Sequence, residues 1–214
     1  MLRAAGFFVA GEVVVSRLWL IRHGEPAAEA RQRCYGDLDI GLSDKGREQM
    51  ARVAASVHAE PFAAIYASPR SRALESARIL AAAAACPLAL VDDFREINFG
   101  DFEGRTYDEI ARDHPELFRQ WMETPTQIHF PNGESFFQMR ARVLAAFHDI
   151  RRTHQGQTIA IVSHGGVNRI ILSWALAMPE EALFRIAQAY AAQSLLQFVE
   201  GVPLVEFLNR RLDL

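Results

Sequence analysis

The segment "RLWLIRHGEP", residues 17–26, runs from an apolar stretch straight into charged and flexible residues. Residues 18–21 are all apolar, which predicts a strand buried in the core. Arg22, His23 and Gly24 follow without a break. A basic pair at the end of a buried strand is costly unless a partner compensates its charge. The end of this strand is therefore the first candidate for an anion-binding site.

The composition of the 214 residues is that of an ordinary globular domain, with 50% hydrophobic and 23% charged residues. A formal net charge of −3 provides no strong positive field, so we expect neither nucleic acid nor a membrane as a partner. Cys34 and Cys86 stand far apart and outside any C-x-x-C motif, which argues against a disulfide framework or a thiolate metal site. This cysteine usage favours a cytoplasmic protein.

Residues 1–15 are expected to form a loosely held N-terminal extension to a single domain over 16–214. A basic residue and an apolar run in this extension resemble a signal peptide. Gly6, Gly11 and Glu12 interrupt the run, however, and it is shorter than the roughly 20 apolar residues that span a membrane.

Apolar strands and amphipathic helices alternate along the rest of the chain. This alternation predicts an α/β fold with three layers, α/β/α, around a mostly parallel central sheet. Residues 100–132 contain three prolines that interrupt the pattern, so we expect an insertion there that acts as a lid over the site. The expected strands cover about 16–21, 63–67, 88–91, 158–163, 194–199 and 203–208, and the expected helices about 44–59, 71–85, 133–152 and 167–176.

Three of the predicted strands end in residues that suit an anion. Residues 22–24 follow the first strand, residues 68–72 (SPRSR) follow the second, and residues 164–166 (HGG) follow the strand at 158–163. Ligands of open α/β sheets bind beyond the carboxyl ends of the strands, so these groups should converge. Arginine forks match phosphate oxygens, glycine lets the backbone approach closely, and a helix N-terminus favours an anion. The sequence therefore predicts a site for a phosphoryl group.

Two residues are candidates for chemistry on that group. His23 is expected to be the nucleophile, since a neutral imidazole is available near pH 7. Glu96, in "FREINFGDFEG", is expected to protonate the leaving oxygen. Its apolar neighbours in sequence would favour the protonated carboxyl. Glu103 is the rival donor, although with Gly104 it is more typical of a turn.

Each motif also has an interpretation without function. Basic residues such as Arg70 are usually solvated, and a histidine before two glycines can belong to a plain turn. The stretch "DLDIG", residues 37–41, resembles an aspartyl nucleophile motif, but no apolar strand precedes Asp37. The seven histidines show no spacing typical of metal ligands, so we expect no metal and no cofactor.

Together these motifs make the sequence, from about Arg17 to Leu208, resemble the histidine phosphatase superfamily, also called the phosphoglycerate mutase-like family. The resemblance implies an α/β/α fold, a metal-independent reaction and phosphorylation of His23. It implies that Glu96 is the proton donor. The residues it places around the phosphate are Arg22, Arg72, His164 and Gly165.

Within the superfamily, four stretches are similar to the branch that acts on alpha-ribazole 5′-phosphate. They are "RLWLIRHGE", "CYGDLDIGLS", "FGDFEG" and "PNGES". Some of these motifs are shared with broad-specificity phosphatases. We expect a small phosphorylated metabolite as the substrate, with Tyr35 and Gly36 in its pocket. Tyr107, Phe118, Trp121 and Phe130 are weaker candidates for the same pocket. The departures from the usual family pattern are Pro26, Glu29, Arg70 and Ser76.

Two other functions stay open from the sequence. A phosphoglycerate mutase would return the phosphoryl group to its substrate instead of releasing it to water. A non-catalytic module would only bind phosphorylated ligands, although such a module has no need of Glu96. A homodimer also stays open.

Overall fold

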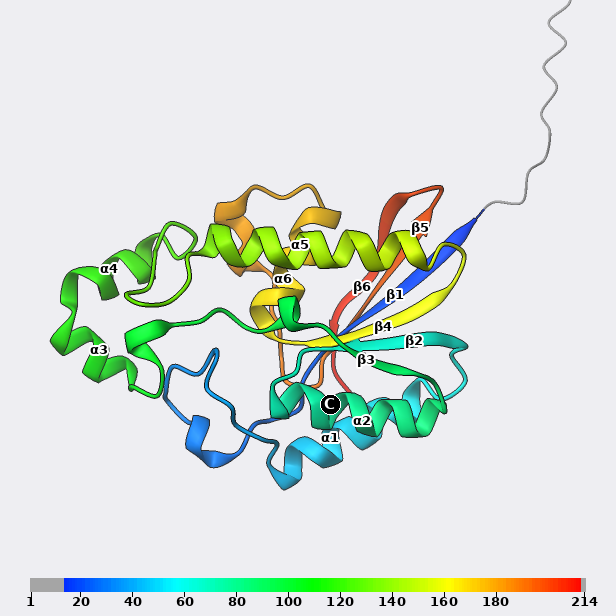
Figure 1. The fold of residues 1–214 in the computed structure, drawn as a ribbon, viewed down its shortest axis with the longest axis horizontal. Helices are drawn as coiled ribbons and strands as arrows, with labels where there is room; N and C mark the ends of the chain where they lie inside the picture. The colour runs from blue at the N-terminus through cyan, green and yellow to red at the C-terminus, as the bar shows by residue number, and fades with distance from the viewer. Residues whose placement is uncertain (1–13, 213–214) are drawn as a thin grey trace, which may run out of the picture.

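The computed structural model describes residues 14–212, which form a six-stranded sheet between two layers of helices (Figure 1). The order of strands across the sheet is β3-β2-β4-β1-β5-β6. The pairs β1–β4, β2–β4 and β2–β3 are parallel, whereas β5 is antiparallel to both of its neighbours. The prediction of a mostly parallel sheet is confirmed. The strands are β1 (Val15–Arg22), β2 (Phe62–Ala67), β3 (Leu88–Leu90), β4 (Thr158–Ser163), β5 (Gln193–Val199) and β6 (Val202–Arg210).

Both faces of the sheet are covered, which produces the predicted three layers. Side chains alternate along β1, so Leu18 and Leu20 pack into one core while Trp19 and Ile21 pack into the other. The first core lies under α5 (Phe136–Thr153) and α6 (Gly165–Ala175). The second lies under α1 (Asp44–Ser56) and α2 (Ser71–Ala84). Figure 1 shows these two helix pairs on opposite sides of the strands.

The helix starts follow the capping signals in the sequence. The Ser43 hydroxyl accepts the N–H of Gly46 at 3.0 Å, so the predicted cap of α1 is confirmed. Ser135 and Gln138 form a capping box at the start of α5. The helix expected from 133 therefore begins three residues later, at Phe136. The helix expected to reach 59 ends at Ser56.

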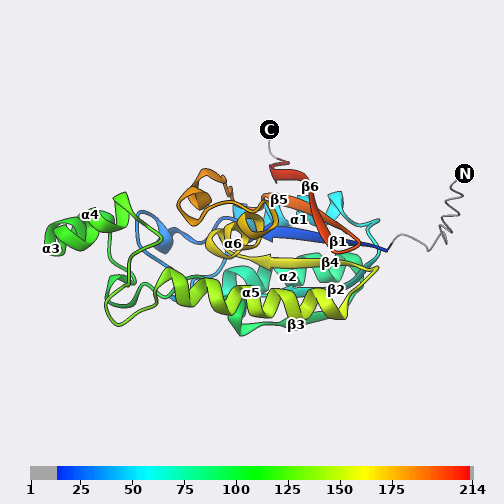
Figure 2. The same ribbon diagram turned by 90° about the horizontal axis from the view of Figure 1, so that it is seen from above.

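The expected insertion contains two short helices, α3 (Tyr107–Asp113) and α4 (Pro115–Glu123). They lie together at one end of the molecule in both views (Figures 1 and 2). Phe102, Ile110 and Phe130 form a small core of their own under these helices. That the segment acts as a lid stays a prediction.

β1 begins at Val15, one residue before the strand expected from about residue 16. Residues 1–13 of the expected extension lie outside the described residues. Within residues 14–212, no helix has both the length and the apolar character needed to cross a bilayer.

Candidate active site

The carboxyl ends of β1, β4 and β2 lie side by side, because β4 is hydrogen-bonded between the other two strands. Arg22 pairs with Ser163 in the register of β1 and β4, and Ala67 pairs with Val162 in that of β2 and β4. The residues that follow these positions surround a cavity of about 160 Å³. Its lining consists of Arg22, His23, Arg33, Tyr35, Arg72, Glu96, Phe99, Tyr107 and His164.

His23 lies just beyond β1 and is almost wholly buried, with 1% of its surface exposed. Its Nδ1 donates a hydrogen bond to the carbonyl oxygen of Gly24 at 2.7 Å. A carbonyl can only accept, so the neutral ring carries its hydrogen on Nδ1 and keeps a lone pair on Nε2. Burial, and then the charges of Arg22 and Arg72, hold the pKa of His23 well below its ordinary value. His23 is therefore a neutral base at neutral pH.

Arg72, in the first turn of α2, is fully buried. Its Nη1 donates to the carbonyl of Leu38 at 2.9 Å, and its Nη2 donates to the carbonyl of Gly36 at 2.6 Å. Its Nε has no hydrogen-bond partner among the described residues. Burial lowers the pKa of Arg72, yet a guanidinium stays charged in proteins.

Arg22, at the end of β1, is held in a similar way. Its Nη1 donates to the carbonyl of Gln188, and its guanidinium lies 4.2 Å from the ring centroid of Tyr190. Its buried Nε also lacks a partner. Within residues 14–212, neither Arg22 nor Arg72 forms an ion pair with a carboxylate. Two guanidinium groups thus line the cavity without an ion-pair partner among the residues described.

His164 follows directly after β4, is the N-cap residue of α6, and is 1% exposed. Its Nε2 lies 2.8 Å from the Ser68 hydroxyl, and its ring centroid lies 5.3 Å from that of His23. Burial, followed by the charge of Arg72, holds the pKa of His164 well below its ordinary value. Its Nδ1 has no partner among the described residues. If Ser68 donates to Nε2, the neutral ring carries a hydrogen on Nδ1 that can be donated to an anion.

Glu96 meets the N-terminus of α6. Its Oε2 accepts the backbone N–H of Gly166 at 2.9 Å, and its Oε1 accepts the N–H of Ile97 at 3.1 Å. A side-chain carbon on Gly166 would lie 2.2 Å from Oε1, so only glycine allows this approach. The expectation that the N–H groups opening this helix are free for a phosphate is wrong at Gly166, because Glu96 occupies that donor.

The expected apolar surroundings of Glu96 are only partly present. Ile97 and Phe99 line a cavity beside it. Phe94 is buried in the core under α5 and α6, whereas Phe102 is buried in the core of the insertion. The residues that neighbour Glu96 in the sequence are therefore divided between two cores. The backbone N–H groups of Gly166 and Ile97 contact its carboxylate instead.

The remaining predicted residues are close to the cavity, but not all of them line it. Tyr35 does, and its hydroxyl is 2.6 Å from that of Tyr190. Gly36 contributes the carbonyl that holds Arg72, and a side chain there would collide with the Ile97 carbonyl at 1.7 Å. Gly165 lies next to the Arg22 guanidinium, where an added Cβ would be 3.6 Å from Nε, and it is not among the lining residues; that it contacts phosphate stays a prediction.

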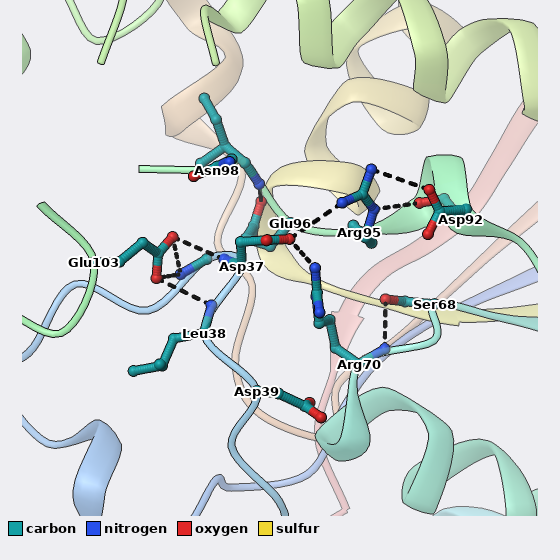
Figure 3. Close-up of polar contacts among 12 residues, drawn as sticks. Asp37, Leu38, Asp39, Ser68, Arg70, Asp92, Arg95, Glu96, Asn98 and Glu103 are labelled. Atoms are coloured by element: carbon teal, nitrogen blue, oxygen red, sulfur yellow. Dashed lines mark hydrogen bonds and ion pairs between the residues drawn. The ribbon is translucent and has the colours of Figure 1, made fainter. Parts of the chain in front are cut away.

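Glu103 has a structural role in the loop at 36–38. Its carboxylate accepts the N–H groups of Asp37 and Leu38 (Figure 3) at 2.8 and 3.1 Å. It also accepts those of Gly36 and Phe99, at 3.0–3.1 Å. Carbonyls of the same loop hold Arg72. The prediction of a turn at Glu103 agrees with Gly104, whose φ is +77°.

The Asp37 carboxylate forms ion pairs with Arg70 and, at 3.4 Å, with Arg95 (Figure 3). The aspartyl nucleophile interpretation of "DLDIG" is therefore unsupported, because Asp37 is engaged by two cations outside the cavity lining. The ion pair with Asp37 gives the arginine at position 70 a structural role.

The family model of the histidine phosphatase superfamily, branch 1, matches residues 18–211. The chain belongs to this superfamily. Several of its relatives are named phosphatases, and phosphoric monoester hydrolysis is the class of chemistry that the match assigns to this chain.

Three relatives of this histidine phosphatase show the range of substrates in their names. Phosphoserine phosphatase 1 of Hydrogenobacter thermophilus is 33% identical over 69% of this chain and 70% of its own length. Adenosylcobalamin/alpha-ribazole phosphatase of Salmonella typhimurium is 29% identical over 91% and 96%. The solved alpha-ribazole phosphatase from Shigella flexneri is 27% identical, with a TM-score of 0.83 over 91% of this chain and 96% of that one. Three mycobacterial relatives are longer, and the chain spans 54% of each.

Three residues at the site of this phosphatase were not predicted from the sequence: Tyr190, Gln188 and Ser68. Tyr190 and Gln188 come from the segment before β5. Because β5 is antiparallel to β1, with Ile21 opposite Gln193, its beginning lies at the edge where β1 ends. A hairpin turn between the two last predicted strands sets only their direction relative to each other, so no sequence signal indicated the direction of β5 relative to β1.

Two departures from the usual family pattern lie outside the lining of the cavity of about 160 Å³. Pro26 forms an isolated bridge with Leu42, and Glu29 is exposed in a short 3₁₀ helix, Ala28–Ala30. Of the weaker pocket candidates, Tyr107 lines this cavity and a second one beside Glu96. Phe130 is buried in the core of the insertion and Trp121 packs against it, and both also line the second cavity. Phe118 packs against that core and lines neither cavity beside Glu96.

Proposed function

We propose that this protein hydrolyses phosphate monoesters through a phosphohistidine formed at His23. One observation carries the proposal: a neutral, buried imidazole faces a small cavity into which two guanidinium groups without carboxylate partners also point. A phosphoryl group supplies the negative charge that Arg22 and Arg72 lack. It also supplies an acceptor for the unpaired Nδ1 of His164.

In the first step, the Nε2 lone pair of His23 attacks phosphorus and the bond from phosphorus to the ester oxygen breaks. The proton of the Glu96 carboxyl passes to that oxygen, so an alcohol leaves. Arg22, Arg72 and His164 donate to the equatorial oxygens while charge develops on them.

In the second step, a water molecule attacks the phosphohistidine in line with the P–N bond. The Glu96 carboxylate accepts a proton from this water, and the P–N bond electrons return to Nε2. Inorganic phosphate is released and both residues recover their starting forms. The overall change consumes one ester and one water and yields one alcohol and one phosphate.

For the substrate we propose alpha-ribazole 5′-phosphate. Two relatives named for alpha-ribazole match this chain over 91% of its length and 96% of their own. The sequence motifs around the cavity resemble the same branch.

A second candidate substrate is a small ester that carries another anionic group, such as phosphoserine. The observation that favours it is a wider cavity of about 490 Å³, which shares Arg22, Arg33 and Tyr35 with the phosphate cavity. Arg31 and Lys45 line its far side. Lys45 is paired with Glu25 at 2.8 Å, which reduces the positive charge of this cavity.

The test is a panel of phosphate esters with wild-type protein, a His23→Ala variant and a His58→Ala control. His58 is exposed and bonds only to the carbonyl of Ala55 among the residues described. We expect His23→Ala to lose phosphate release and His58→Ala to retain it. A ³¹P NMR signal of phosphohistidine in quenched wild-type protein is also expected. Conversion of 3-phosphoglycerate to its 2-isomer, without free phosphate, would instead show a mutase.

A further inference from the structure

A second cavity adjoins Glu96, and its character differs from that of the phosphate cavity. It encloses about 230 Å³, a volume below the roughly 300 Å³ of pockets for drug-sized ligands. Aromatic and aliphatic side chains dominate its wall. Among them are Phe99, Trp121, Phe130, Phe136, Leu183 and Phe184. The two charged members of the wall, Glu96 and Arg169, are of opposite sign.

This apolar cavity adjoins Glu96, the proposed proton donor to the leaving group. It shares Glu96, Phe99 and Tyr107 with the phosphate cavity but does not include His23. In an in-line displacement, the leaving oxygen lies opposite the nucleophile, next to the proton donor. The wider polar cavity contacts neither His23 nor Glu96. An alcohol that left through this wider cavity would move away from Glu96, its proposed proton donor.

From these observations we infer that the apolar cavity binds an uncharged aromatic ring on the alcohol part of the substrate. The inference rests on the proposed function and narrows its substrate class. Flat rings pack well against the edges and faces of other aromatic side chains. Trp121 and Phe130 already meet edge to face, with ring centroids 5.2 Å apart. The volume suits a ring system attached to a small sugar or alkyl chain, and excludes a whole macrocyclic cofactor.

Phe184 offers a way to test the cavity without disturbing a core. It lies on the 3₁₀ helix Glu180–Arg185, is 48% exposed, and lines the cavity beneath the Arg169 guanidinium, 5.4 Å from its ring centroid. Trp121 and Phe130 are less suitable, because they pack in the core of the insertion. Phe137 is a matched control: it is a phenylalanine, 72% exposed, and lines none of the cavities described above.

The substrates should differ in the ring and not in the leaving oxygen. The experiment therefore compares kcat/KM for 2-phenylethyl phosphate and propyl phosphate, two alkyl esters of similar leaving-group acidity. We expect wild-type protein to favour the phenylethyl ester by at least about tenfold, since burying a ring is strongly favourable. Phe184→Ala should lower kcat/KM for that ester by roughly three- to tenfold and leave propyl phosphate within about twofold. Phe137→Ala should change neither, and Phe184→Tyr should retain most of the preference.

The outcomes separate this inference from the proposed mechanism. Three outcomes would overturn the aromatic site without contradicting the proposed phosphatase mechanism. They are an equal kcat/KM for the two esters, an equal loss of kcat/KM for both in Phe184→Ala, and a higher kcat/KM for phosphoserine. Absence of turnover with any ester would instead contradict the mechanism. The ring site can then still be judged by calorimetry with His23→Ala, where 2-phenylethyl phosphate should bind at least about tenfold more tightly than propyl phosphate. Equal binding there would also overturn it.

Discussion

The carboxylate of Glu96 is hydrogen-bonded to the backbone N–H of Gly166, at 2.9 Å, across 70 residues of sequence. This contact fixes the proposed proton donor against the first turn of α6, directly beyond His164 and therefore next to the phosphate cavity. It exists only because position 166 has no side chain, since one would lie 2.2 Å from Oε1. Gly166 is thus a positioning residue for Glu96.

Gly166→Ala should therefore impair the protonation of the leaving group more than the attack of His23. We expect kcat for propyl phosphate to fall by at least about 30-fold, because general acid catalysis commonly contributes 10²–10⁴ in rate. We expect p-nitrophenyl phosphate, whose leaving group needs little protonation, to stay within about threefold. Steady-state kinetics with both esters measures the difference.

Glu96→Gln is the comparison for that variant and should show the same dependence on leaving group. Thermal denaturation of Gly166→Ala monitors folding. An equal loss with both esters would mean that Gly166 shapes the site as a whole and does not act through Glu96.

The pH behaviour of His23 should differ from that of an ordinary histidine. Burial and the adjacent guanidinium groups hold its pKa well below its ordinary value, so the ring stays neutral while the pH falls through the usual histidine range. Protonation would remove the nucleophilic lone pair, so activity should be lost only at a pH well below about 6.5. In NMR titration, the His23 signals, assigned by comparison with His23→Ala, should not shift between pH 7.5 and 6. A transition centred near 6.5 would contradict the described burial.

Arg72 should not be replaceable by lysine. Its two Nη groups donate to the carbonyls of Leu38 and Gly36, which leaves the Nε edge as a fixed donor at the cavity. A lysine has one flexible ammonium and cannot make these contacts together. We expect Arg72→Lys to lower kcat/KM by roughly 10²-fold or more, the usual cost of losing a donor that stabilises a developing anion.

Arg70→Leu is the matched control for Arg72→Lys. Arg70 lies two positions away and pairs with Asp37 outside the cavity. A partly exposed ion pair contributes only about 0.2–1 kcal/mol. The free energy of unfolding should change by no more than that, and kcat/KM should stay within about threefold. Similar losses from both variants would mean that the charge of this region matters, and not the geometry of Arg72.

Glu103→Gln should affect both stability and phosphate binding. The carboxylate accepts four backbone N–H groups, and an amide presents an NH₂ to some of these donors. Leaving one or two donors unsatisfied should cost about 1–3 kcal/mol in the free energy of unfolding, measured in urea. Because the same loop holds Arg72, the inhibition constant of inorganic phosphate should also rise. Glu109→Gln, in a capping box that accepts either residue, should change neither quantity appreciably.

The layers of the fold and the core of the site follow from sequence patterns alone. Apolar periodicity distinguishes strands from helices, and parallel strands bring their carboxyl ends to one edge. These two regularities are enough to place His23, His164 and Arg72 together.

Which groups contact one another at that edge depends on how the whole chain packs. The antiparallel direction of β5 brings Tyr190 and Gln188 to Arg22, and the pairing of Glu96 with Gly166 replaces the free helix N-terminus that was expected. Glu103, which competes with Glu96 as an acid in the sequence, proves to hold the loop behind Arg72. The physical reason is that local pattern reports which face of an element is buried. Hydrogen bonds between segments tens of residues apart depend on the packing of the whole chain, and periodicity carries no record of that packing.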